Sequence, residues 1–435
     1  MKNNFKRNAY ISSPLINSLQ TVLSRVLELT YKIIAMLTTL QKKAFALHET
    51  WYFYLPPFPL QFDPKYEKLI LNNSISSWVT PFIFMISCGI ALIGHIYILF
   101  SHYYVQPLEL FGVANAFMLI FGTVSIFILV ILFTVLVRKL EDWIDGINHV
   151  FSIERRLIKN LFLSEYPEKS KPTKRLDILG LFACNFVLSC VAITTLAIPL
   201  AIHSKFDYIG YILDDLFPWN LNDDAEPRAT QIGFIVIRIT VMSIIVIEAA
   251  RFAIFILLLA MSFIESALVC FKWMGKKINN VEDFLRFFIT FKVAIRFVED
   301  TSSDLLGVAL TSGFWGLVGL VWISIKGYGV LVEWLYVAMS FGAVVSLFIH
   351  ALTLSSIKTV HVLSTEMIAK WRAAAKMTQV TQKNWRSKGI AKQVCTFTPP
   401  AVSYGPFFKL GPNFVIEFFS AFTEREMNTV IMFDL

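Results

Sequence analysis

Charged side chains are scarce in this chain. Aspartate, glutamate, lysine and arginine make up 16% of its 435 residues, whereas they make up about a quarter of an ordinary soluble protein. Hydrophobic residues make up 56%, and they collect in runs of about 20 residues or more, long enough for a helix to cross a hydrocarbon layer about 30 Å thick. The composition excludes an ordinary soluble domain and predicts an all-α membrane protein.

Sequence motifs of enzyme and metal chemistry are also missing. No G-x-S-x-G, H-E-x-x-H, P-loop, CxxC or His/Cys metal spacing occurs. The five cysteines lie in apolar runs or basic loops, so no disulfide framework is indicated. The net charge of +8 does not indicate nucleic-acid binding, because the basic residues flank apolar runs and no folded basic domain is present. We expect no enzyme, no cofactor and no metal site.

Seven apolar segments predict a polytopic membrane protein. Six of the segments are strongly apolar, and the seventh carries several charges. The expected spans are Trp78–Phe100, Phe111–Val137, Ile178–His203, Ile232–Ile264, Leu305–Ile325, Leu331–Ile357 and Val415–Phe433. We therefore divide the chain into an N-terminal cytosolic segment, residues 1–77, and a seven-helix membrane domain, residues 78–435.

Basic residues lie almost entirely on one side of these spans. Of the 39 lysines and arginines, 32 lie in residues 1–77, 138–176, 263–303 and 358–405, whereas segment 204–231 is acidic. Because short loops follow the positive-inside rule, we expect the N-terminus and the three basic loops to be cytosolic. With seven spans in the plasma membrane, the C-terminus would lie outside the cell.

The cytosolic segments are expected to be largely helical. Residues 139–162 and 279–300 are helix-forming and would continue the spans below the membrane. Residues 14–40 carry apolar side chains at helical spacing and predict an amphipathic helix. That helix either lies at the membrane interface or packs on the cytosolic helices. The aromatic, proline-rich residues 51–64 cannot be helical throughout.

Several residues within the spans are candidates for function. Glu248 and Arg251 are three residues apart, so they share a helix face and can form an intramembrane ion pair. Arg238 either extends to the outer surface or faces a water-filled cavity. Residues in the outer halves of the spans either line an apolar ligand pocket or face lipid and core. These pocket candidates are Phe117, Phe121, Thr195, Arg238, Met242, Trp334 and Tyr336.

The last span is unusually polar. It carries Glu424, Arg425, Glu426 and Asn428 within its second half, and polar groups at membrane depth are tolerated only where they face water or protein. Several copies around an axis would place polar rings beside a hydrophobic constriction, as in a pore. The alternative is an interfacial helix that never spans.

Together these features resemble the insect gustatory and odorant receptor superfamily. The shared features are seven spans, an internal N-terminus, long helical cytosolic loops and a short last span. The segments PPFPLQFDPKYEKL (56–69) and CTFTPPAVSYGPFFKLGPNFVIEFFSAFTEREMNTVIMF (395–433) are similar to those of divergent, springtail-like arthropod members. The gustatory signature, Thr-Tyr, five residues and then Gln-Phe, is not present, since Val430 follows Thr429.

The resemblance implies a ligand-gated, non-selective cation channel. Such a receptor would be a homo- or hetero-tetramer, with or without a co-receptor, opened by a small-molecule tastant or odorant that binds among the outer parts of spans two to six. Each subunit would contribute its seventh span to one pore. Glu424 and Glu426 would then lie in the polar vestibule, and Met427, Val430 and Ile431 at the constriction.

Two other classes of membrane protein are alternatives to the channel. A G-protein-coupled receptor would have an external N-terminus, and its Asp-Arg-Tyr and Asn-Pro-x-x-Tyr motifs are missing. A secondary transporter would show internal repeats and Gly/Pro-broken spans in matching positions, and no such repeat is seen. The charge distribution therefore favours the channel.

We predict that a tag on the N-terminus is stained only after cells are permeabilised, and that a tag on the C-terminus is stained on intact cells. The sequon at Asn72 should carry no glycan, because it would lie on the cytosolic side. An external N-terminus or a glycan at Asn72 would reverse the orientation. If both termini proved to be cytosolic, the number of spans would be even. The seventh segment would then not cross the membrane and could not line the pore.

Overall fold

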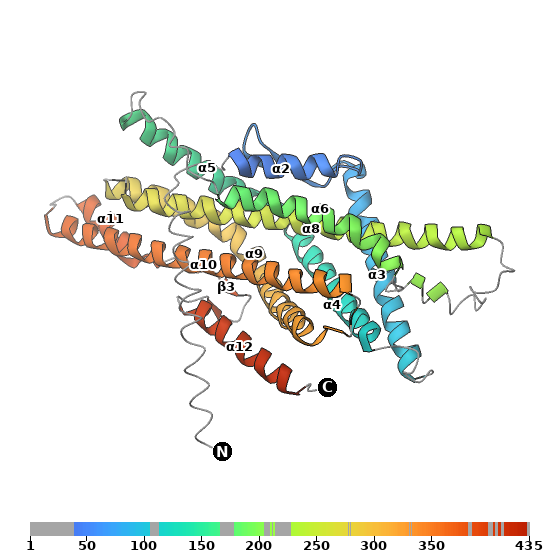
Figure 1. The fold of residues 1–435 in the computed structure, drawn as a ribbon. Helices are drawn as coiled ribbons and strands as arrows, with labels where there is room; N and C mark the ends of the chain where they lie inside the picture. The colour runs from blue at the N-terminus through green and yellow to red at the C-terminus, as the bar shows by residue number, and fades with distance from the viewer. Residues whose placement is uncertain are drawn as a thin grey trace, which may run out of the picture.

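The computed structural model is an all-α bundle with two small hairpins (Figure 1). It describes residues 39–104, 113–165, 178–203, 209–210, 212–213, 228–276, 278, 280–329, 331, 333–381, 385–398, 403–404, 408–409 and 413–432. The helices are α2 (Thr39–Trp51), α3 (Ile75–Tyr104), α4 (Val113–Arg138), α5 (Leu140–Glu165), α6 (Ile178–His203), α8 (Arg228–Lys276), α9 (Val281–Lys326), α10 (Glu333–Thr381), α11 (Trp385–Thr396) and α12 (Phe414–Met432). The strands are β1 (Leu60–Asp63), β2 (Lys68–Leu71), β3 (Ser403–Tyr404) and β4 (Phe408–Lys409).

Five stretches of the described helices are long and apolar enough to cross a membrane. They are Ile75–Ser101, Leu119–Arg138, Ile232–Gly275, Ser303–Lys326 and Leu335–Met377, and they correspond to expected spans one, two, four, five and six. Span three lies on α6, whose apolar stretch Gly180–Leu196 is shorter. Span seven lies on α12, which is not among the five because four charged residues lie along its 19 residues. The predicted class, an all-α multi-pass membrane protein, is confirmed.

Three helices run far beyond the thickness of a bilayer. α8 and α10 have 49 residues each and α9 has 46, which corresponds to roughly 70 Å at 1.5 Å per residue. Expected spans four and six lie within longer helices, since α8 and α10 continue past Ile264 and Ile357 without a break. The predicted continuation over residues 279–300 is present as the first half of α9.

The start of α9 has a sequence-encoded cap. The side chain of Asn280 accepts a hydrogen bond of 3.0 Å from the backbone N–H of Glu282. Glu282 and Asp283 add negative charge to the first turn, where the helix dipole is positive. These three residues fix where the helix begins below the span.

A β-hairpin precedes the first span, which the sequence analysis did not predict. β1 and β2 pair antiparallel, with Leu60 opposite Leu71. Asn148 of α5 holds the hairpin at both polar groups of Leu69, accepting from its N–H at 2.7 Å and donating to its carbonyl at 3.0 Å. α2 ends at Trp51, so residues 51–64 are indeed not helical throughout. The amphipathic helix expected over 14–40 lies outside the described residues, except for its last two.

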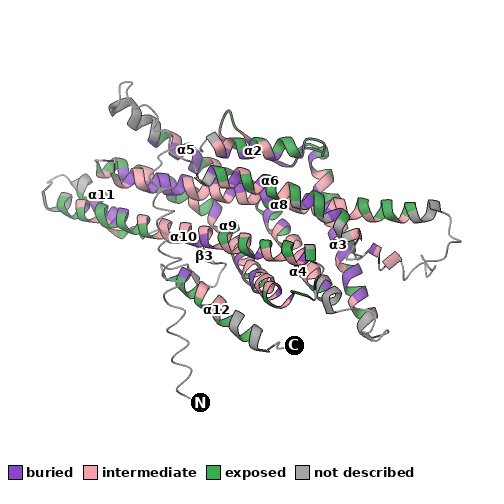
Figure 2. Ribbon diagram, viewed as in Figure 1, coloured by how far each residue is buried: buried purple, intermediate pink, exposed green. Residues whose placement is uncertain are grey.

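Buried residues follow the helix faces that meet within the bundle, and exposed residues follow the opposite faces (Figure 2). At one end of the bundle, α5, α8, α9, α10 and α11 surround an aromatic core, with the Phe284 ring stacked on Trp371 at 4.6 Å. Trp371 Nε1 also donates to the Met274 carbonyl of α8 at 3.1 Å. This inner end, the one expected to be cytosolic, therefore joins the long helices through ring packing.

A carboxyl group is buried near this inner end. Glu154 of α5 is 4% exposed, and burial raises the pKa of its carboxyl to about 7. A hydrogen bond from Ser266 of α8 opposes that rise in pKa, whereas nearby Glu265 and Glu67 add to it. Gln41 of α2 donates to Glu265, so α2, α5 and α8 meet at this cluster of polar residues.

We predict that the thermal stability of the purified protein falls as the pH rises from about 5 to 8. Because the folded state holds a proton on Glu154 up to about pH 7, the stabilisation is complete below the ordinary glutamate pKa and is lost as the pH rises through 7, an effect of about 3 kcal/mol. Melting in detergent, followed by size-exclusion chromatography, measures it. Glu154→Gln should flatten the pH dependence of the melting temperature. The control Glu141→Gln, at an exposed position of α5, should leave it unchanged. Equal pH slopes for the wild type and both variants would contradict the assignment of this effect to Glu154.

Candidate functional site

The residues expected to line a ligand pocket lie on α4, α6, α8 and α10. Met242 of α8 is half-buried and packs on an apolar cluster of α3 and α4 that includes Leu119. Phe121 of α4 is also half-buried. Thr195 of α6 is exposed, and its hydroxyl donates to the Val191 carbonyl of its own helix at 2.8 Å. Phe117 and Trp334 belong to α4 and α10, but their side chains lie outside the described residues.

Arg238 takes a role that the sequence analysis did not consider. Its guanidinium crosses from α8 to the C-terminal end of α6, where Nη2 donates to the Ile202 carbonyl at 3.2 Å. The last carbonyls of a helix have no partner within the helix and carry a partial negative charge. A cation at this place therefore caps α6. Gly210 gives it room, since a methyl group there would lie 3.1 Å from Nη2.

Tyr336 joins α10 to α9 close to the turn between them. Its hydroxyl donates to the Ser324 carbonyl at 3.1 Å, and its ring meets Tyr328 edge-on at 5.7 Å. The turn contains Gly329 with φ of 79°, a conformation that suits glycine. Met242, Arg238 and Tyr336 thus contact three different neighbours: the cluster of α3 and α4, the end of α6, and α9.

The two buried charges of α8 form an ion pair. Arg251 Nη1 lies 3.3 Å from Glu248 Oε1, and both side chains are about 5% exposed or less. Arg251 also reaches the segment before the first span, because its Nη2 donates to the Pro56 carbonyl at 2.9 Å and its guanidinium lies 5.2 Å from the Phe58 ring. The pair therefore lies on the contact between α8 and the segment that follows α2.

His48 of α2 completes this contact from the other side. Its Nε2 lies 3.1 Å from the Arg251 carbonyl, and because a carbonyl can only accept, Nε2 carries the proton. Burial lowers the pKa of His48 to about 4, so the ring is neutral at physiological pH. The sequence does not point to His48, Pro56 and Phe58, because they lie about 200 residues from Arg251 along the chain and share no motif with it.

The last helix has an apolar half that docks and a polar half that follows. Val415 and Phe418 of α12 are buried against Leu310 of α9 and Leu354 of α10. Farther along, Glu424 is exposed, and the Arg425 guanidinium lies 5.8 Å from the Trp315 ring of α9. The other pore candidates belong to α12, but their side chains lie outside the described residues; they are Glu426, Met427, Val430 and Ile431.

We predict that Arg251→Ala strongly destabilises the protein, by about 3–5 kcal/mol, because it leaves the Glu248 carboxyl buried without its partner. The double variant Arg251→Leu/Glu248→Leu should recover part of the loss, since neither charge then remains. Arg286→Ala, at an exposed position of α9, serves as the control. Melting in detergent measures all three, and a melting temperature for Arg251→Ala equal to that of the control would show that the pair does not anchor α8.

No family model matches the sequence, and no curated protein matches it. Among solved structures, the chain is similar to the insect olfactory receptor OR5 from Machilis hrabei, with 11% identity and a TM-score of 0.43 over 89% of this chain and 97% of that chain. A second structure of OR5, in complex with eugenol, has the same identity and TM-score over 90% of this chain and 97% of that chain. Both are structures of the same insect olfactory receptor.

Proposed function

We propose that this chain is a subunit of a chemosensory, ligand-gated cation channel in the plasma membrane. The observation that carries the proposal is the division of α12 into an apolar half docked on α9 and α10 and a polar half with Glu424 exposed. The proposed orientation has the N-terminus in the cytosol and the C-terminus outside, as the distribution of lysine and arginine favours. The proposal includes no enzymatic step.

The length and polarity of α12 support a pore-lining role. Its 19 residues correspond to about 28 Å, close to the hydrocarbon thickness of a bilayer. A single copy would expose Glu424 to lipid, which costs several kcal/mol for a charged side chain. Several copies around an axis would instead give this carboxyl water, and the acidic ring so formed would favour cations. Four copies, with or without a co-receptor subunit, is the number that the family resemblance implies.

The ligand is proposed to be a small, largely apolar molecule, a tastant or an odorant. Met242 and Phe121 are half-buried in the part of the bundle that the proposed orientation places outermost, and apolar sites with few polar groups bind such molecules. A ligand that binds the open state more tightly than the closed state shifts the population toward conduction. This arrangement separates the place of binding, among α4 and α8, from the proposed conduction path along α12.

We predict that cells expressing the wild-type chain, alone or with a co-receptor, show ligand-evoked currents that do not discriminate between Na⁺ and K⁺. Glu424→Gln should reduce the permeability of Ca²⁺ relative to Na⁺, because a neutral ring attracts divalent cations less strongly. Whole-cell recording with ion substitution measures both.

The matched control is Glu333→Gln, at an exposed glutamate in the first turn of α10, which should leave the permeability ratio unchanged. A protein that reaches the cell surface and binds a labelled odorant, yet passes no current with any partner, would contradict the channel. Binding coupled to G-protein activation would then favour the competing seven-helix receptor class.

A further inference from the structure

We propose that the contact between Gly313 of α9 and His350 of α10 positions α12 and thereby sets the balance between its closed and open arrangements. This inference rests on the proposed function, in which α12 lines the pore. It assigns a positioning role to two residues that lie outside the pore and the ligand-pocket candidates.

Gly313 leaves the space that the His350 imidazole occupies. A methyl group at Gly313 would lie 2.7 Å from His350 Cε1 and would overlap Nε2 even more closely. Two other glycines of the same helix differ, because a methyl group at Gly316 or Gly319 would meet nothing within 4 Å. Close approach of α10 therefore requires glycine at position 313 and at neither of these two positions.

The His350 imidazole is held by a hydrogen bond within α10, and it packs against α12. His350 Nδ1 donates to the Ser346 carbonyl at 2.8 Å. The same ring lies nearly parallel to that of Phe418, with 5.8 Å between ring centroids and 16° between their planes. A displacement of His350 by a side chain at position 313 would therefore reach Phe418 directly.

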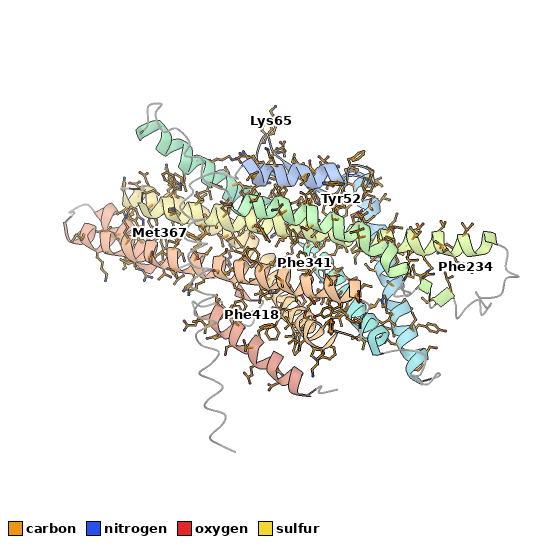
Figure 3. The ribbon with its side chains drawn as sticks, viewed as in Figure 1. Tyr52, Lys65, Phe234, Phe341, Met367 and Phe418 are labelled. Carbon is orange, nitrogen blue, oxygen red and sulfur yellow. The ribbon has the colours of Figure 1, made fainter. Side chains whose placement is uncertain are left out.

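Phe418 is the centre of the contact that α12 makes with the bundle (Figure 3). It is buried, and its ring also meets Phe314, the residue after Gly313, edge-on at 5.3 Å. Phe314 further contacts Phe422 one turn along α12, at 6.3 Å. The docked half of α12 is thus held by Leu310 and Phe314 of α9 and by His350 and Leu354 of α10.

Through these contacts, a movement of α9 or α10 would affect the polar half of α12. Tyr336 joins the two long helices near their outer turn, and Gly313 and His350 join them again where α12 docks. Packed side chains change between discrete arrangements rather than deform smoothly. A small movement of α9 against α10 would therefore re-seat Phe418, and with it the helix that carries Glu424.

The test compares Gly313→Ala, His350→Ala, the double variant and the control Gly316→Ala in cells. Ligand-free current and half-maximal ligand concentration are measured, with surface expression as the check on folding. Gly313→Ala should change the half-maximal concentration by about 2- to 30-fold, the range expected for coupling residues that touch no ligand. Gly316→Ala should change neither quantity. Gly313→Ala should have no further effect in the His350→Ala background, since the ring that it displaces is then absent.

The outcomes separate this inference from the proposed function. If the wild type conducts and Gly313→Ala behaves like Gly316→Ala, the inference is overturned and the channel stands. The inference is equally overturned if Gly313→Ala acts with full effect when His350 is already alanine. If Gly313→Ala does not reach the surface, His350→Ala decides alone, because loss of its ring from Phe418 should shift the ligand-free current, and an unchanged current overturns the inference. If the wild type passes no current with any partner, both proposals fail.

Discussion

The structure depends on one constraint: polar groups within an apolar bundle must find partners in the protein itself. Arg251 meets this constraint with Glu248 on one side and the Pro56 carbonyl on the other. Arg238 meets it at the unpaired carbonyls that end α6. Each of these two cations, the buried Arg251 and the half-buried Arg238, thus joins its own helix to a second segment, so the cost of removing charge from water helps to decide which segments are neighbours.

Three long helices, α8, α9 and α10, run through the bundle without a break. α9 and α10 extend from the turn between them, where Tyr336 contacts Ser324, to the end of the bundle where Phe284 stacks on Trp371. Because no loop interrupts α8, α9 or α10, each of these helices connects distant parts of the bundle. The polar cluster around Glu154 and Ser266 adds a pH-sensitive contact at that inner end.

The two halves of the last helix have different surroundings. Its first half presents Val415 and Phe418 to the bundle and is stabilised by apolar burial. Its second half carries an exposed carboxylate at Glu424, which is stable only beside water or another protein surface. The His350 ring of α10 packs on Phe418 of the docked half, which makes it suited to relay movement from α10 to α12.

The sequence by itself determined the all-α membrane class and where the long apolar helices lie, because hydropathy, length and helix capping are properties of local segments. Asn280, for example, marks the start of α9 by its own side chain. Only the tertiary structure decided that a hairpin docks on Asn148, that Arg251 reaches Pro56, and that Gly313 admits His350. Each of these depends on which helices become neighbours, and packing between segments distant in the chain decides that, not any local pattern.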